Sequence, residues 1–296
     1  MQVLELRNDA FIDPIRRPSI LGSCNGLICL RLSTYRISLC ILVWNPAVRE
    51  ARVTGALSYS ENNDYRVGFG FSPTANDYKI VNIRVCSIVD LVNQVEVLTL
   101  STGSWREVEF GSLDRVAVLS NGYNTDGAIF WDAVKLGVDE EGEDDVEVIV
   151  SFDIAMEVFT LIPIPSASSA ISIAYENKLA MLSHDTRRDS QSSSIHLWVR
   201  DEEGTCASGE GCSWVKKCTS NPYLGSLLGP VTVWRNEIVC NLYPSCRPVE
   251  NDERKIVLFN LTTNEFKTFY IRKSTLSYNI FNYAESLVPV GNIHIE

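Results

Sequence analysis

Five strand–turn–strand units recur along this chain, and they limit its possible folds more than any other feature. In each unit an alternating apolar run reaches a turn of Asn, Asp, Ser, Thr, Pro or Gly, and a second alternating run follows. Such alternation predicts a half-buried β-strand, and a short polar turn between two runs predicts a hairpin. The five units are Ile41–Val53, Val95–Phe110, Val148–Pro165, Ser193–Thr219 and Lys255–Ile271.

The spacing of these units predicts a repeat architecture. Equivalent positions in the five units are Leu42, Val97, Ile149, Ile195 and Ile256. Successive steps between them are 55, 52, 46 and 61 residues. Repeats of about 40–50 residues are typical of propeller blades. The longer and uneven steps found here indicate insertions between the strands.

A second element precedes each hairpin, a pair of short apolar strands pinched at a polar turn. The five pairs are Ser23–Leu30, Tyr65–Ile83, Ser120–Ala133, Ile171–Ser183 and Val231–Tyr243. One pair and one hairpin make about four strands per repeat, as a propeller blade requires. We therefore predict an all-β protein with a single propeller domain at residues 20–296, preceded by a lead-in segment at residues 1–19.

The number of blades is left open between five and six four-stranded blades. Five hairpins are visible in the sequence. A sixth blade would close from the N-terminal strand pair and the last apolar run, Glu285–Val290. Aromatic residues near the hairpin turns, such as Trp44 and Trp105, are interpreted as packing anchors between blades.

Composition excludes several classes of function. The 296-residue chain carries a formal net charge of −11. Nucleic-acid affinity depends on Lys and Arg side chains that neutralise phosphates, so we expect no nucleic-acid partner and no anionic membrane surface. The longest near-apolar run, Ile37–Trp44, is far shorter than the roughly 20 residues of a membrane helix. Nine irregularly spaced cysteines favour reduced thiols in a cytoplasmic or nuclear compartment over a disulfide framework.

The sequence contains no convincing catalytic, cofactor or metal constellation. Its three histidines stand in unrelated contexts. Cys206, Cys212 and Cys218 are six residues apart, whereas structural zinc sites usually pair cysteines two to four residues apart. Gly68-Phe69-Gly70 lies in an alternating strand and lacks the third glycine of a dinucleotide loop. We therefore expect a binding protein without a cofactor rather than an enzyme.

Charged loops are the candidate partner-binding surface, because recognition residues concentrate on loops held by a rigid scaffold. The acidic run at residues 139–145 is either a solvated loop or a lip that attracts a basic partner by long-range electrostatics. The candidate residues are Asp139, Glu140, Glu141, Glu143, Asp144, Asp145, Arg187, Arg188, Asp201, Glu202 and Glu203.

Seven short motifs, in order along the chain, resemble the plant F-box-associated domain. GSCNGLICL, WNPAVR and GFGF followed by NDYKIV are similar to that family's GSCNGLLCL, WNPATR and GFGYDSxxNDYKVV. LSTGSWR, GAIFW, SFD and YAESLV also resemble its later motifs. The matching positions singled out are Cys24, Asn25, Gly26, Trp44, Asn45, Pro46, Gly68, Gly70, Asp77, Tyr78, Lys79 and Trp105.

The resemblance implies a kelch-like β-propeller that captures target proteins for ubiquitin ligases of the SKP–cullin–F-box type. In that family an N-terminal F-box docks on the adaptor. The residues before Gly22 are too few for an F-box and lack its Leu-Pro-x-Asp/Glu opening. We therefore expect this chain to bind a target protein. Its acidic charge would suit a basic target. The SKP-type adaptor and cullin would be partners only where an F-box is supplied upstream.

An alternative is that the chain acts outside a ligase. It would then be a propeller scaffold or decoy that binds its target without delivering it to the adaptor.

Overall fold

The computed structural model describes residues 16–33, 38–58, 63–137, 144–165, 170–187, 192–201, 213–224, 227–243, 253–272 and 281–291. Regular structure in these ranges is β-strand, apart from one 3-10 turn at Gly111–Leu113. No helix among them is long and apolar enough to cross a membrane.

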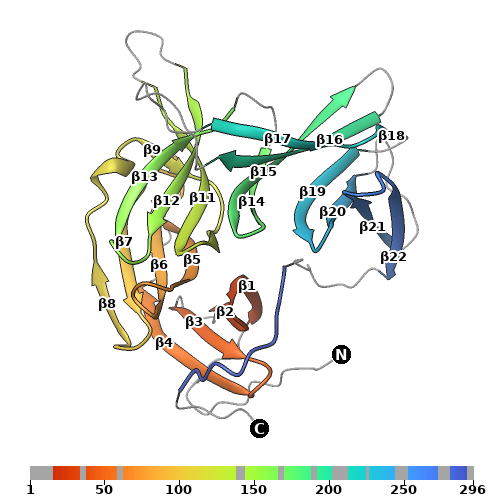
Figure 1. Cartoon of the computed structure of the whole chain (residues 1–296). Coiled ribbons are helices and arrows are strands. Elements are labelled where there is room, and N and C mark those ends of the chain that lie inside the picture. Colours follow the sequence, from red (N-terminus) through yellow and green to blue (C-terminus); the bar gives the residue numbers. More distant parts are fainter. Residues whose placement is uncertain are drawn as a thin grey trace. The chain divides into compact units, whose positions relative to one another are not determined.

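The strands form five antiparallel sheets, each built on a four-strand meander in chain order (Figure 1). The first sheet contains β1 (Arg16–Cys24), β2 (Leu27–Ser33), β3 (Ser38–Asn45) and β4 (Glu50–Ser58). The second contains β5 (Asn63–Ser72), β6 (Asp77–Cys86), β7 (Val92–Thr99) and β8 (Ser104–Glu107). The third contains β9 (Val116–Val118), β10 (Tyr123–Thr125), β11 (Ala128–Lys135), β12 (Val146–Asp153) and β13 (Val158–Pro163).

The two remaining sheets follow the same plan. The fourth contains β14 (Ala170–Tyr175), β15 (Lys178–Arg187), β16 (Ser192–Asp201), β17 (Ser213–Thr219) and the short β18 (Tyr223–Leu224). The fifth contains β19 (Leu227–Trp234), β20 (Glu237–Tyr243), β21 (Glu253–Asn260) and β22 (Phe266–Arg272). In the third and fourth sheets an extra short strand pairs beside the meander, β9 with β11 and β18 with β16. Each predicted pinched pair supplies the first two strands of a four-strand meander, and each predicted hairpin supplies the last two.

The described residues contain five sheets of the blade type, within the predicted range of five to six, and no sixth sheet. The N-terminal pair, β1 and β2, belongs to the first sheet together with β3 and β4. Residues 285–290 form no strand, because side chains rather than a neighbouring strand bind their backbone. Five sheets of the blade type are therefore present in the part of the chain that the structure describes.

The chain divides into two compact units. The first unit comprises Met1–Val146, Val150–Leu161 and Tyr283–Glu296, and the second comprises Glu147–Ile149 and Ile162–Asn282. Each unit has its own apolar core. The core of the second unit draws on β14, β15, β16, β19, β20 and β21 and includes Leu182, Ile195, Cys240 and Phe259.

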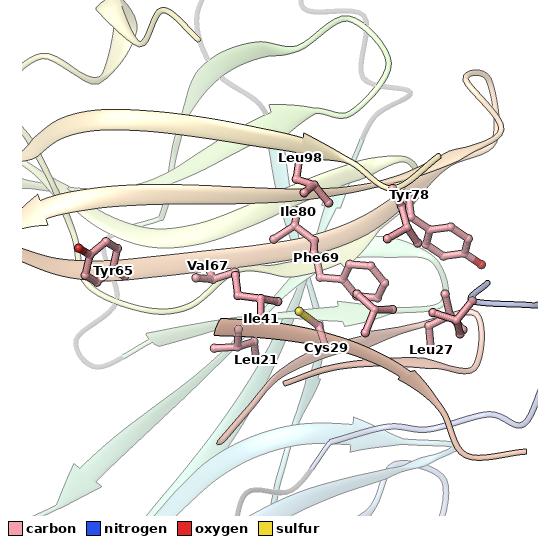
Figure 2. Packing of buried hydrophobic residues seen from close by; sticks show 13 residues of the cluster. Leu21, Leu27, Cys29, Ile41, Tyr65, Val67, Phe69, Tyr78, Ile80 and Leu98 are labelled. Carbon is pink, nitrogen blue, oxygen red and sulfur yellow. The ribbon is translucent and has the colours of Figure 1, made fainter. Parts of the chain in front are cut away.

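The core of the first unit lies between its first two sheets (Figure 2). Leu27 and Ile41 of the first sheet face Phe69 and Ile80 of the second, and all four side chains are at most 1% exposed. Trp105 packs against this cluster, and its Nε1 donates a hydrogen bond to the carbonyl of Thr54 on β4 at 3.0 Å. The interpretation of Trp105 as a packing anchor between sheets is therefore confirmed.

Two glycines of β5 allow the second and third sheets to approach closely. A Cβ at Gly68 would lie 2.5 Å from the Trp131 ring on β11, and one at Gly70 would lie 2.7 Å from Ile154. Trp131 is fully buried. The Gly-Phe-Gly pattern is therefore a strand that packs face to face with a large aromatic side chain, as its alternation predicts, and not a phosphate-binding loop.

The six cysteines among the described residues carry free thiols. Burial raises the pKa of Cys29 far above its ordinary value of 9.0 and that of Cys240 to about 12. Burial also raises the pKa of Cys24 to about 11, although a hydrogen bond with the Phe71 backbone acts in the opposite direction. These thiols pack as small apolar groups that stay protonated in the folded chain.

Alkaline pH is expected to destabilise the protein through these thiols. A thiol whose pKa is higher in the folded than in the unfolded chain adds stability below pH 9, and this stability is lost as the pH rises towards the folded pKa. For Cys29 the loss at pH 10 is about 1 kcal/mol. Urea unfolding at pH 8 and pH 10 measures it, with Cys29→Ala as the comparison. Equal pH dependence in the two proteins would show that Cys29 makes no such contribution.

Candidate functional site: a pocket beside the tail segment

Three motifs that are far apart in the sequence meet at one end of the first unit. The tail segment, residues 283–291, runs in an extended conformation past the turns of the first sheet. The side chain of Asn45 is fully buried, and its Nδ2 donates to the carbonyls of Ser286 at 3.0 Å and Val288 at 2.7 Å. Its Oδ1 accepts the Ala47 N–H at 2.9 Å and so shapes the turn after β3. One asparagine therefore binds the tail segment and orders the β3–β4 turn.

The β1–β2 turn contacts the same part of the tail segment. The hydroxyl of Ser286 donates to the carbonyl of Asn25 at 2.5 Å. A Cβ on Gly26 would lie 2.3 Å from that hydroxyl oxygen, so only glycine leaves room for Ser286. Further along, the Glu50 carboxylate accepts the Val290 N–H at 2.9 Å. The CNG, WNP and ESLV motifs are therefore parts of one contact.

A pocket of about 440 Å³ opens beside this contact. Its walls come from the β1–β2 turn, the β5–β6 hairpin and the tail segment. The lining residues are Asn25, Phe71, Asn76, Tyr78, Ala284, Glu285, Ser286 and Val288. Figure 2 shows Tyr78 at the end of the buried cluster, with its hydroxyl pointing away from the other side chains. The pocket is open to solvent and lies within the size range of ligand-binding pockets.

Aromatic and polar groups are both present in the pocket wall. The rings of Phe71 and Tyr78 have centroids 4.8 Å apart and are tilted by 48°. Burial raises the pKa of the Tyr78 hydroxyl, and a hydrogen bond with Asn25 acts in the opposite direction. The hydroxyl is therefore neutral at physiological pH. Asn25 and Asn76 both have a φ of 48°, a backbone conformation that asparagine adopts more readily than most residues.

Asp77 and Lys79, next to the pocket in sequence, have structural roles. The Asp77 carboxylate accepts hydrogen bonds from the backbone N–H and the hydroxyl of Ser101, which links two neighbouring turns. Lys79 is 7% exposed, and its Nζ donates to the carbonyl of Ile154 at 2.7 Å and to Glu157 at 2.5 Å. Burial is the largest cause that lowers the pKa of Lys79, and the positive charge of Arg106 lowers this pKa further. This lysine holds the third sheet against the second.

The remaining motif positions lie in the first sheet and its turns. Cys24 packs partly buried against the core cluster, Trp44 pairs with Ile28 and Ala51, and Pro46 begins the turn after β3.

Few residues of the candidate loops lie in the part of the chain that the structure describes. Asp144 and Asp145 are exposed, and the Asp145 carboxylate accepts the N–H of Gly137 at 3.1 Å across the base of the acidic loop. Arg187 ends β15 and Asp201 ends β16. Outside the described residues lie Asp139, Glu140, Glu141, Glu143, Arg188, Glu202 and Glu203. The candidate loops therefore stay a prediction.

Two of those loops leave the fourth sheet at opposite ends. Arg187 pairs with Ser192, the first residue of β16, whereas Asp201 is the last residue of that strand. A strand of ten residues spans about 30 Å. The strand ends at which the two loops begin therefore lie at opposite ends of this sheet.

Sequence reasoning missed a hydrogen-bonded chain across the fourth sheet. His196 Nε2 lies 2.9 Å from the Asp185 carboxylate, and its Nδ1 lies 3.0 Å from the Thr219 hydroxyl. Acid, imidazole and hydroxyl groups in this order can activate a nucleophile, but catalysis also needs a substrate cavity and donors for an oxyanion. The pocket described above does not include these residues. The chain of hydrogen bonds joins β15, β16 and β17, and His196 lies in a strand as its alternating neighbours predict.

The described residues contain no group of three or more His, Cys, Asp or Glu side chains that could hold a metal ion. Of the three cysteines weighed as zinc ligands, Cys206 and Cys212 lie outside the described residues.

Comparison with known proteins identifies the class of this fold. The model of the F-box associated beta propeller domain matches residues 10–284. Because this match covers most of the chain, the protein belongs to that family. Its five-sheet architecture is accordingly a β-propeller, as the repeat spacing predicts.

Relatives in Arabidopsis thaliana are named as F-box proteins. The chain is 24% identical over 259 residues to At3g10240, provisionally named an F-box protein, covering 82% of this chain and 61% of the relative. It is 25% identical over 289 residues to At3g22730, provisionally named an F-box/kelch-repeat protein, covering 90% of this chain and 70% of the relative. The chain thus spans about two thirds of the length of these relatives.

Among solved structures, TolB from Acinetobacter baumannii is similar with a TM-score of 0.47 and 10% identity, covering 88% of this chain and 55% of TolB.

Proposed function

We propose that this chain is the target-binding part of a substrate receptor for ubiquitin ligases of the SKP–cullin–F-box type. The observation that carries the proposal is the match of the F-box associated beta propeller domain to residues 10–284. The relatives' F-box names support it. In this role the propeller binds a protein, and an F-box joined to it recruits the SKP-type adaptor and the cullin.

Binding without catalysis is the second part of the proposal. The buried Lys79 of the first unit is occupied in holding two sheets together through its contact with Glu157. The pocket beside the tail segment is open and is lined by aromatic rings, amides and one carboxylate. Such a pocket suits a side chain of another protein. The free thiols of the described cysteines favour a reducing compartment, the cytoplasm or the nucleus.

A fusion experiment tests the receptor function. An F-box of known adaptor affinity is joined to the N-terminus of the full chain, and proteins carrying ubiquitin remnants are quantified in plant cells that express the fusion. We expect a small set of proteins whose ubiquitination rises several-fold. The control is the same fusion with an F-box that cannot bind the adaptor.

The fusion experiment also separates the receptor from the scaffold. If the chain binds the same proteins in both fusions and none gains ubiquitin, it acts as a scaffold. If no protein depends on the chain for either binding or ubiquitination, the proposed function is wrong.

A further inference from the structure

The pocket beside the tail segment combines three chemical features that together select one kind of side chain. Its lining residues include two aromatic residues, Phe71 and Tyr78, two asparagines, Asn25 and Asn76, and one acidic residue, Glu285. The lining residues include no Lys, Arg or His. If the chain has the proposed function, this pocket would receive a side chain of the target.

The pocket wall is held in place before any partner binds. Asn45 fixes the backbone at Ser286 and Val288, and Ser286 is tied to the β1–β2 turn through Asn25. Glu285 immediately precedes Ser286 and is exposed to solvent. A wall that is already ordered loses little conformational entropy when a ligand binds.

The charge and shape of the pocket favour a guanidinium group. A carboxylate can accept two parallel N–H bonds from arginine. The planar guanidinium also stacks on aromatic rings and is more weakly hydrated than an ammonium group, so it tolerates an apolar wall better than lysine does. An anion would meet the carboxylate of Glu285 without a compensating cation in the lining. A purely apolar side chain would cover the Glu285 carboxylate and remove it from water without giving it a partner.

The net charge of the chain acts in the same direction. At −11, it attracts basic proteins over long range and raises their rate of encounter. We propose that the pocket lined by Phe71, Tyr78 and Glu285 receives an arginine side chain of the target protein. Phe71 and Tyr78 provide the stacking faces, and Glu285 accepts the guanidinium N–H groups. Arginine-containing segments would thereby be selected over otherwise similar ones.

Binding of small probes to the full chain tests this inference. The probe is Nα-acetyl-arginine amide, and its citrulline analogue has the same shape without the charge. Isothermal titration or ligand-observed NMR should give a Kd for the arginine probe on the order of millimolar, as expected for a ligand of this size. The citrulline probe should bind at least about fivefold more weakly.

Two variants and a control locate the binding. Glu285→Gln should weaken arginine binding about fivefold, and Glu285→Lys should weaken it further. Glu285 is exposed, so both variants are expected to fold. Glu265→Gln removes another exposed carboxylate, in the second unit, and should leave binding unchanged. Equal binding of arginine and citrulline, no binding of either probe, or equal weakening by the control variant would overturn the inference.

The same variants distinguish failure of the pocket from failure of the receptor function. If ubiquitination depends on the chain but is unchanged in Glu285→Lys, the pocket is not the arginine site for the target. The receptor function would then remain intact. If the chain binds arginine and Glu285→Gln weakens that binding, but the chain directs no ubiquitination, the pocket is retained and the receptor function is rejected.

Discussion

Lys79→Met is expected to destabilise the first unit by about 3 kcal/mol. The Lys79 ammonium is buried, and it is bound to the Ile154 carbonyl and to the Glu157 carboxylate. Removing one partner of a buried ion pair leaves the other charge desolvated, which typically costs 3–5 kcal/mol. We take the lower end of this range because Arg106 also pairs with Glu157. Urea unfolding at pH 7, followed by fluorescence, measures the change.

A double-mutant cycle separates the lost charge pair from lost packing. Lys79→Met with Glu157→Met removes both charges and should cost less than the sum of the two single variants. Lys267→Met, at an exposed position on β22, is the matched control and should change stability by less than about 0.5 kcal/mol. A loss below about 1 kcal/mol for Lys79→Met would mean that Lys79 contributes little more than a surface lysine.

The hairpins could be predicted from the sequence because their signals are local. Turn residues and alternation lie within a few positions of each other, as in the β7–β8 hairpin, where Thr99 pairs with Ser104 around Ser101–Gly103. The same holds for the two-residue turn at Asn25-Gly26, whose positive φ values of 48° and 79° suit this residue pair. Local chemistry of this kind fixes where strands begin and end.

The tail segment suggests a strand only because a propeller must close, and residues 285–290 form none. Its backbone is bound by the side chains of Asn45 and Glu50, which precede it by about 240 residues in the sequence. Hydrogen bonds between residues so far apart in the sequence produce no local pattern from which they could be predicted. The sequence shows the motifs, but it does not show that they meet. The pocket beside them therefore could not be predicted.

Lys79 shows the same limit for an ion pair. Its position within an alternating strand predicts neither burial nor Glu157, 78 residues away. His196, Asp185 and Thr219 are joined only through the register of three strands. The charged loops, in contrast, are predicted from their composition. Composition does not indicate at which end of a sheet a loop lies.

Gly26→Ala is expected to destabilise the first unit by about 3 kcal/mol and to release the tail segment. Part of the cost, roughly 1–2 kcal/mol, arises because alanine is disfavoured at a φ of +79°. The rest arises because the new Cβ would lie 2.3 Å from the Ser286 hydroxyl and 2.7 Å from its backbone nitrogen. Moving Ser286 away leaves the buried Asn45 amide without its two acceptors, which costs about 1–3 kcal/mol. Urea unfolding measures the stability, and hydrogen exchange of the Val290 N–H reports the release.

Gly127→Ala provides a control for backbone strain alone. Asp126-Gly127 forms an equivalent two-residue turn between β10 and β11, with φ values of 48° and 71°. A Cβ at Gly127 would meet no atom closer than 3.4 Å. The corresponding turn of the fourth sheet has Glu176-Asn177 with positive φ at both positions, so the turn itself does not demand glycine. Gly127→Ala should therefore carry only the backbone cost and leave Val290 protected. Equal losses in the two variants would show that Ser286 is not what requires glycine at position 26.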